Sequence, residues 1–99
     1  QRLLAQAIEM ASGSPSGAVA ALTLARLKMS EDPLGAANVL TTALRNGVPR
    51  GLEEDARARL VEARARGGDK QGAREAAREY HSRFPQGVHG QEVRRWIPE

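Results

Sequence analysis

Apolar side chains recur along this chain at steps of three and four residues, the spacing that places them on one face of an α-helix. Between these stretches stand Ser, Asp, Asn, Pro and Gly, the residues that start and end helices. No stretch alternates between apolar and polar positions for long enough to form a β-strand. The sequence therefore predicts an all-α protein.

The breaks predict six helices, over residues 1–11, 15–30, 33–46, 51–66, 70–84 and about 88–97. Ser14, Asp32 and Asp69 precede three of them, where a short polar side chain can cap the first turn. Gly47 follows one helix, where glycine can take the left-handed conformation that ends it, and Gly67-Gly68 ends another. We thus expect five or six helices joined by short turns.

Each predicted helix from the second onward carries an apolar stripe that should face the core. The stripes are Ala18, Ala21, Leu22, Ala25 and Met29; Leu34, Ala37, Leu40, Ala43 and Leu44; Leu52, Ala56, Leu60 and Ala63; Ala73, Ala76, Ala77, Tyr80 and Phe84; and Val93, Trp96 and Ile97.

Composition predicts a thin core. Of the 99 residues, 40% are apolar, seventeen are alanine, and Phe, Tyr and Trp occur once each. Cysteine is absent, which excludes disulfides, thiolate metal sites and a cysteine nucleophile. No apolar run approaches the roughly 18 residues of a membrane span, and no signal peptide is recognisable. Because the chain starts at Gln1, we expect a single domain that forms the C-terminal part of a larger protein.

The net charge of +3 suggests an anionic partner, but the kind and placement of the charges weaken that interpretation. Thirteen of the fifteen basic residues are Arg, a bias typical of GC-rich bacterial genomes. Acid-first pairs four residues apart (Glu53–Arg57, Asp55–Arg59 and Glu62–Arg66) predict a solvated helix face with internal ion pairs. A basic stripe free of acids is missing, so a nucleic-acid partner is disfavoured.

Two tandem helix pairs are indicated by the spacing of the breakers. Pro15, Pro49 and Pro85 follow one another at intervals of 34 and 36 residues. Asp32 and Asp69 stand 37 residues apart, and each precedes a Gly-Ala at the same offset. These intervals predict a repeat of about 34 residues.

The chain resembles the tetratricopeptide repeat family, most closely over residues 52–85. Leu60, Ala63, Gly68-Asp69, Ala73 and Pro85 match that family's Leu, Ala, Gly-Asp, Ala and Pro positions. The resemblance implies a fragment of a right-handed α-solenoid built from antiparallel helix pairs. In it, 15–48 and 51–85 are repeats, 1–11 is the second helix of a truncated repeat, and 88–97 is a C-terminal cap.

The pattern departs from the family at two places. Thr23-Leu24 stands where Leu-Gly or Leu-Ala is usual, and Tyr80 replaces a small residue, so wider packing is expected there. The turn from Tyr80 to Gly87 resembles repeat units of bacterial cell-envelope proteins, such as outer-membrane assembly lipoproteins and the outer domains of FecR-like regulators. That resemblance implies a periplasmic or envelope location, although a simple helix end at Phe84-Pro85 explains the motif equally well.

No enzyme signature is found. His81 and His89 are the only histidines, and no partner at i,i+4 accompanies either, so a metal site is not expected. Ser12–Gly17 lacks the Gly-Lys-Ser/Thr of a phosphate-binding loop. We expect no catalytic residue and no cofactor.

The resemblance implies a concave groove lined by the first helix of each pair. Its candidate residues are Ala18, Ala21, Ala25, Lys28, Met29, Asp55, Ala58, Glu62, Ala65 and Arg66. The Lys and Asn side chains with which chaperone-type repeats grip a C-terminal carboxylate are absent from these positions. A second candidate surface is Val93, Trp96 and Ile97, which either cap the preceding pair or expose Trp96 as an anchor for a partner.

These patterns favour a non-enzymatic protein–protein interaction or scaffold module whose partner is another protein or neighbouring repeats. One alternative is an Arg-rich nucleic-acid-binding or regulatory domain that uses residues 51–84. A weaker alternative is a secretion chaperone of the same fold.

Overall fold

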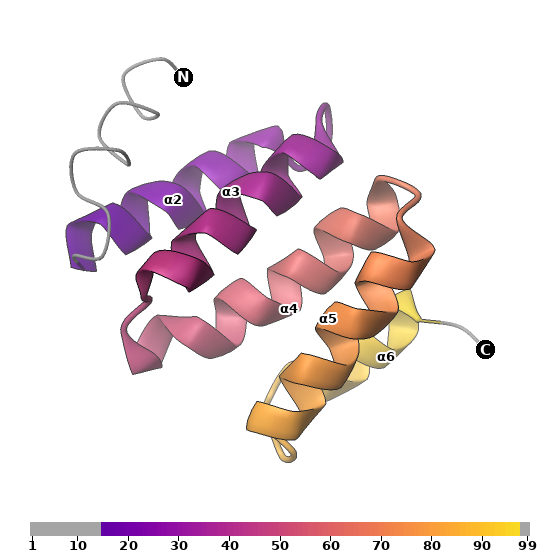
Figure 1. Cartoon of the computed structure of the whole chain (residues 1–99). Coiled ribbons are helices and arrows are strands. Elements are labelled where there is room, and N and C mark those ends of the chain that lie inside the picture. The colour runs from indigo at the N-terminus through magenta and orange to yellow at the C-terminus, as the bar shows by residue number, and fades with distance from the viewer. Residues whose placement is uncertain (1–14, 98–99) are drawn as a thin grey trace.

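The computed structural model describes residues 15–97. They form five α-helices: α2 (Pro15–Lys28), α3 (Pro33–Asn46), α4 (Arg50–Arg66), α5 (Lys70–Arg83) and α6 (Gly90–Trp96). No strand occurs within this range, which confirms the all-α prediction. Consecutive helices from α2 to α5 run antiparallel and pack side by side, and α6 lies against α4 and α5 (Figure 1). The predicted helix over 1–11 and the Ser14 cap fall outside the described residues.

Two aspartates start helices in the same way. Oδ1 of Asp32 accepts a hydrogen bond from the backbone N–H of Gly35 at 3.0 Å, and Oδ1 of Asp69 accepts one from Gly72 at 2.9 Å. A Cβ on either glycine would collide with the capping carboxylate. The repeated Asp-x-x-Gly therefore has a local physical cause, because the glycine leaves room for the cap.

The helix ends also follow the predicted breakers. Gly47 after α3 has φ 104° and Gly68 after α4 has φ 85°, a conformation that side chains with a Cβ rarely adopt. The last helix is an exception, since α6 begins at Gly90, two residues later than predicted. Val88 lies in the preceding turn and is 85% exposed.

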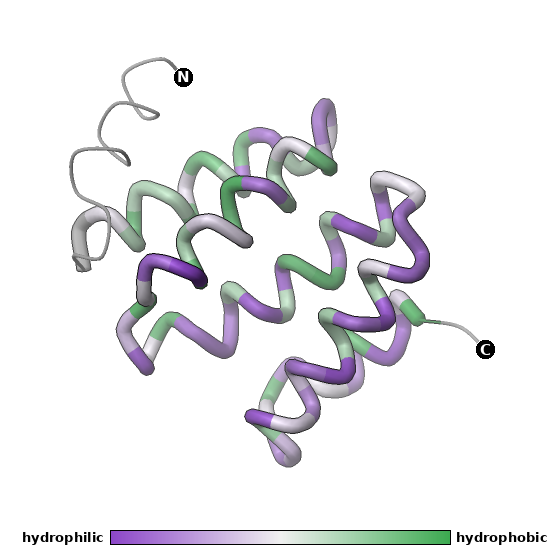
Figure 2. Tube along the Cα trace, in the orientation of Figure 1, coloured by the Kyte–Doolittle hydropathy of each residue, from purple (hydrophilic) through white to green (hydrophobic). Residues whose placement is uncertain are grey.

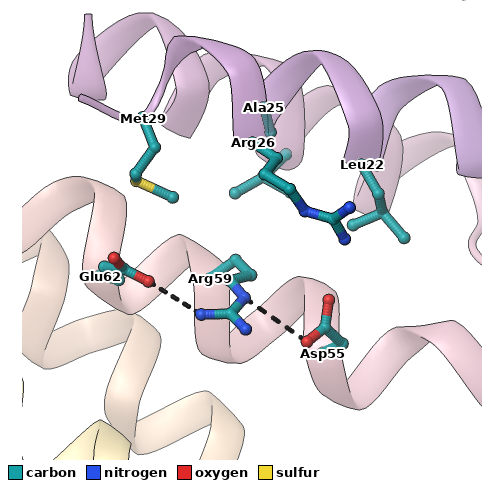
Figure 3. A pocket seen from close by; sticks show the side chains of 8 residues that line it. Leu22, Ala25, Arg26, Met29, Asp55, Arg59 and Glu62 are labelled. Carbon is teal, nitrogen blue, oxygen red and sulfur yellow. Dashed lines mark hydrogen bonds and ion pairs between the residues drawn. The ribbon is translucent and has the colours of Figure 1, made fainter. Parts of the chain in front are cut away.

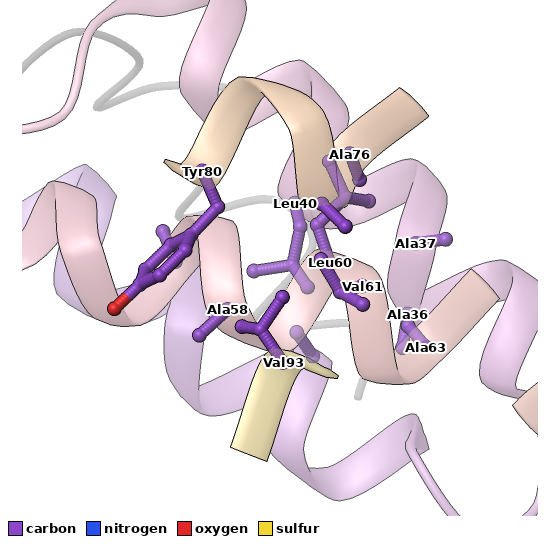
Figure 4. Close-up of a cluster of buried hydrophobic side chains, with 13 residues drawn as sticks. Ala36, Ala37, Leu40, Ala58, Leu60, Val61, Ala63, Ala76, Tyr80 and Val93 are labelled. Atoms are coloured by element: carbon purple, nitrogen blue, oxygen red, sulfur yellow. The ribbon is translucent and has the colours of Figure 1, made fainter. Parts of the chain in front are cut away.

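Alanine dominates the core. Twelve of the eighteen buried apolar residues in the described range are alanine, and the largest fully buried side chains are Tyr80, Leu40, Val61 and Val93 (Figure 4). Small side chains at the contacts let neighbouring helices approach closely. They also contribute little apolar area each, so the few larger residues supply a disproportionate share of the burial.

The charges are unevenly distributed between the helices. α2 carries Arg26 and Lys28 and no acid, whereas more than half of the residues of α4 are charged. Figure 2 shows the same contrast, with the hydrophilic colour more frequent on α4 and α5 than on α2. All three predicted acid-first pairs of α4 are present as ion pairs, with nitrogen–oxygen distances of 2.7, 3.5 and 2.8 Å.

Two of the predicted stripes need correction. Leu34 was expected in the core but is 45% exposed, because it lies in the first turn of α3 and covers the backbone at Gly67. Leu24 was not in the predicted stripe of α2 and is buried. Leu22 and Met29, which were in it, pack only partly against the core.

Tyr80 joins three segments through its hydroxyl group. The hydroxyl donates a hydrogen bond to Oε2 of Glu54 on α4 at 2.7 Å and accepts one from the backbone N–H of His89 at 3.0 Å. Burial, together with the hydrogen bond to Glu54, raises the pKa of Tyr80 to about 12. The same hydrogen bond lowers the pKa of Glu54. The α4–α5 pair is thereby tied to the turn that precedes α6.

Replacing Leu60 by Ala tests the core between the second pair of helices. Leu60 is buried within the core cluster, so the replacement should lower the free energy of unfolding by about 2–5 kcal/mol. Leu27→Ala is the matched control on an exposed site and should change it by less than about 0.5 kcal/mol. Urea denaturation followed by circular dichroism measures both. Equal losses for the two variants would contradict this core.

Tyr80 is the only tyrosine, so the ultraviolet absorbance of tyrosinate reports it alone. We expect the native protein to ionise Tyr80 well above the ordinary pKa of 10.0, near 12, and the urea-unfolded chain to ionise it near 10.0. Between these values the folded state keeps a proton that the unfolded chain has lost. The stabilisation is therefore complete below about pH 10 and disappears as the pH rises towards 12. Tyr80→Phe should lack this part of the decline in urea melts, and a native midpoint near 10.0 would contradict the arrangement.

Candidate functional site

A recess opens between α2 and α4, which both pack against α3 (Figure 3). Its volume is about 220 Å³. We call it the α2–α4 recess, and its lining residues are Leu22, Ala25, Arg26, Met29, Leu40, Asp55, Arg59 and Glu62.

One side of the recess is apolar. Leu22 and Met29 are half-buried and face across from α2 and the turn that follows it (Figure 3). Ala25 and Leu40, which are both buried, also line the recess. The small Ala25 side chain leaves the space that a larger residue at this position would occupy.

The opposite side consists of charged residues that are already paired. Asp55, Arg59, Glu62 and Arg66, which we call the α4 charge row, are three or four residues apart and share one face of α4. Nε of Arg59 lies 3.5 Å from Oδ1 of Asp55, and its Nη1 lies 3.1 Å from Oε1 of Glu62. Nε of Arg66 lies 2.8 Å from Oε2 of Glu62. Each charge in the row therefore has a partner of opposite sign.

Glu62 explains why the row needs two arginines. The residue is only 8% exposed, and a buried carboxylate is costly unless it is paired and hydrogen-bonded. Each of its carboxylate oxygens accepts a hydrogen bond from one guanidinium group. Oε1 accepts from Arg59, and Oε2 accepts from Arg66. Partial burial opposes the charge on Arg59, but its acidic neighbours outweigh this and raise the pKa of its guanidinium.

The charge row also attaches α6 to α4. Oδ1 of Asp55 lies 3.6 Å from Nε2 of His89, and Nη1 of Arg59 lies 3.5 Å from Oε1 of Glu92. The guanidinium of Arg66 lies over the ring of Trp96, 5.1 Å from its centre. The residues that contact the charge row from α6 and from His89 before it cover one side of α4. The side of α4 that faces α2 stays open as the recess.

The structure brings together only part of the groove that the sequence predicts. Ala25, Met29, Asp55 and Glu62 line the recess. The other predicted residues lie elsewhere: Ala18, Ala21 and Ala58 are buried, Lys28 pairs with Asp32 at 3.5 Å, Ala65 faces α6 in a separate depression, and Arg66 covers Trp96.

Four lining residues were missed as groove residues: Leu22, Arg26, Leu40 and Arg59. The spacing of Asp55 and Arg59 was visible in the sequence, but it indicated only an ion pair. The rotation of α2 and α4 about their axes decides which residues face the recess, and contacts with α3 set that rotation.

The predicted terminal surface is divided by the fold. Val93 is fully buried in the core, so a partner cannot contact it. Trp96 and Ile97 are half-buried and pack against the core cluster. Trp96 is therefore partly covered, by the core on one side and by Arg66 on its ring.

Within residues 15–97, no group of three or more His, Asp or Glu side chains could hold a metal ion. None of the helices in this range is long and apolar enough to cross a membrane. Comparison with protein-family models, with curated proteins and with solved structures finds no significant match to this chain.

Trp96 is the only tryptophan, so its fluorescence reports the Arg66 contact. Arg66→Ala should shift the emission to longer wavelength and increase quenching by acrylamide, because the ring loses its cover. Arg45→Ala is the control, because it removes an exposed arginine from the last turn of α3. It should leave the emission wavelength and the acrylamide quenching unchanged. Unchanged quenching in folded Arg66→Ala would contradict the contact.

Proposed function

We propose that this chain is a non-enzymatic protein-interaction module of the tetratricopeptide kind, and that the α2–α4 recess is its binding site. The observation that carries the proposal is the recess itself, in which an apolar side from α2 faces a row of paired charges on α4. The alternation of helix pairs, with Asp32 and Asp69 capping the second helix of each, supports the repeat assignment.

The size of the recess favours a side chain of a larger partner over a small molecule. Pockets for small molecules enclose roughly 300–1,000 Å³, and this recess has about 220 Å³. Leu22 and Met29 would contact an apolar anchor residue. Arg26 has no ion-pair partner among the described residues and would bind a carbonyl or carboxylate group of the same partner.

The pairing of four α4 arginines favours a protein over a nucleic acid as the partner at the recess. Arg57, Arg59 and Arg66 are bound to acids, and Arg64 donates to the backbone oxygen of Gly72 at 3.0 Å. A phosphate backbone would have to displace these acids before it could bind the α4 arginines beside the recess.

The resemblance of Tyr80–Gly87 to repeat units of envelope proteins supports a role in a bacterial cell-envelope regulatory or assembly protein. A secretion chaperone of the same fold is a further alternative. It predicts co-purification with one specific secreted protein.

Replacing Leu22 by Arg tests the recess. Peptides selected from a displayed random library against the wild-type domain should bind Leu22→Arg at least about tenfold more weakly, because the new charge occupies the apolar side. Leu27→Arg is the matched control, since it lies on the same helix, is 54% exposed and is not part of the recess. Titration calorimetry measures the affinities, and circular dichroism checks that both variants are folded.

Two results would contradict the proposal. One is that every selected peptide binds Leu22→Arg as tightly as the wild type. The other is tight binding of duplex or single-stranded DNA that falls steeply between two salt concentrations, which would favour the nucleic-acid alternative.

A further inference from the structure

A depression larger than the α2–α4 recess lies between α5 and α6. These two helices are at the end of the array opposite α2 (Figure 1). Its volume is about 960 Å³. We call it the α5–α6 groove, and its lining residues are Arg74, Ala77, Arg78, His81, Ser82, Arg94 and Ile97.

The groove exists because α6 covers only part of α5. α6 is seven residues long, and Val93 anchors it in the core while Glu92 binds Arg59 of α4. On α5, the lining residues from Arg74 to Ser82 follow steps of three and four, so they form one face of the helix. Ala77 and Ile97 give this face an apolar floor.

The arginines of the groove differ from those of the α4 charge row in having no acidic partner in the part of the chain that the structure describes. Within residues 15–97, the side chains of Arg74, Arg78 and Arg94 form no ion pair and no hydrogen bond, in contrast to the α4 charge row. On α5, Glu79 is bound to Arg83 at 2.9 Å, and Glu75 does not line the groove. Three guanidinium groups thus surround an apolar floor with no acid among the lining residues.

We propose that the α5–α6 groove binds an acidic amphipathic helix of a partner protein. From Arg74 to Ser82 the α5 face spans nine residues, about 12 Å, which matches about two turns of a docked helix. Such a helix would place apolar residues at i, i+3 or i+4 and i+7 on Ala77 and Ile97. Its flanking Glu or Asp side chains would pair with Arg74, Arg78 and Arg94.

The charges argue against a second copy of this chain as the occupant. At the opposite end of the array, Val19 and Leu27 are exposed apolar residues of α2. That helix carries Arg26 and Lys28 and no acid, so it would bring cations to cations. This groove and the α2–α4 recess share no lining residue, so each proposal can fail without the other.

The probe is a synthetic, fluorescein-labelled helical peptide of about 14 residues, with Leu at i, i+3, i+4 and i+7 and Glu on both flanks. A second peptide carries Lys in place of every Glu. Fluorescence anisotropy at about 0.15 M salt should show the Glu peptide binding to the wild type and not the Lys peptide. Arg78→Glu and Arg94→Glu should each weaken binding of the Glu peptide at least about tenfold.

Arg45→Glu is the matched control. Arg45 and Arg94 both stand in the last turn of a helix and are exposed, and the substitution changes the charge by the same amount. Arg45→Glu should keep the affinity for the Glu peptide within about twofold. The double variant Arg78→Glu with Arg94→Glu should prefer the Lys peptide, an inversion that a merely unfolded protein would not show.

The proposal is overturned if the Glu peptide does not bind, if Arg45→Glu weakens it as much as Arg94→Glu, or if the double variant does not invert the preference. It is also overturned if phosphatidylglycerol vesicles or single-stranded DNA bind more tightly than the Glu peptide and lose affinity with the same two substitutions.

Discussion

The close approach that alanine allows between neighbouring helices is the constraint on which the rest of this structure depends. Most of the buried apolar side chains are alanine, so α2 to α5 can pack side by side with little between them. The gain in apolar burial per residue is small, and a few larger side chains must complete the core. Leu40, Val61, Tyr80 and Val93 have this role.

Polar contacts hold α6 in place, because Val93 is the only residue of this helix that is buried. A helix of seven residues is not stable alone, because helix nucleation is unfavourable and few hydrogen bonds follow it. Val93 of α6 is buried in the core, and the hydroxyl group of Tyr80 accepts a hydrogen bond from His89 in the turn before α6. Arg59 of the α4 charge row also pairs with Glu92 of α6. The buried Glu62 is tolerated because two arginines satisfy it, and one of those arginines also contacts Glu92 of α6.

The same packing leaves two openings with different chemistry. Between α2 and α4, the charges are paired with one another, so the apolar side of the recess has the greater role in our proposal. Between α5 and α6, the arginines lack acids among the described residues, so in our proposal a partner supplies the opposite charge. The two surfaces lie on different helices and would select different partners, which suits a module that joins proteins together.

The sequence by itself determined the helices and most of their ends, because caps and breakers act within a few residues. Asp32 can reach Gly35, and Gly47 can take a positive φ, whatever the rest of the chain does. Tertiary structure decided which faces are open. Leu34 proved exposed and Leu24 buried, and only some of the predicted groove residues line the recess. The spacing of Asp55 and Arg59 predicted their ion pair, whereas the contact of Arg59 with Glu92 joins residues far apart in the sequence and depends on the fold.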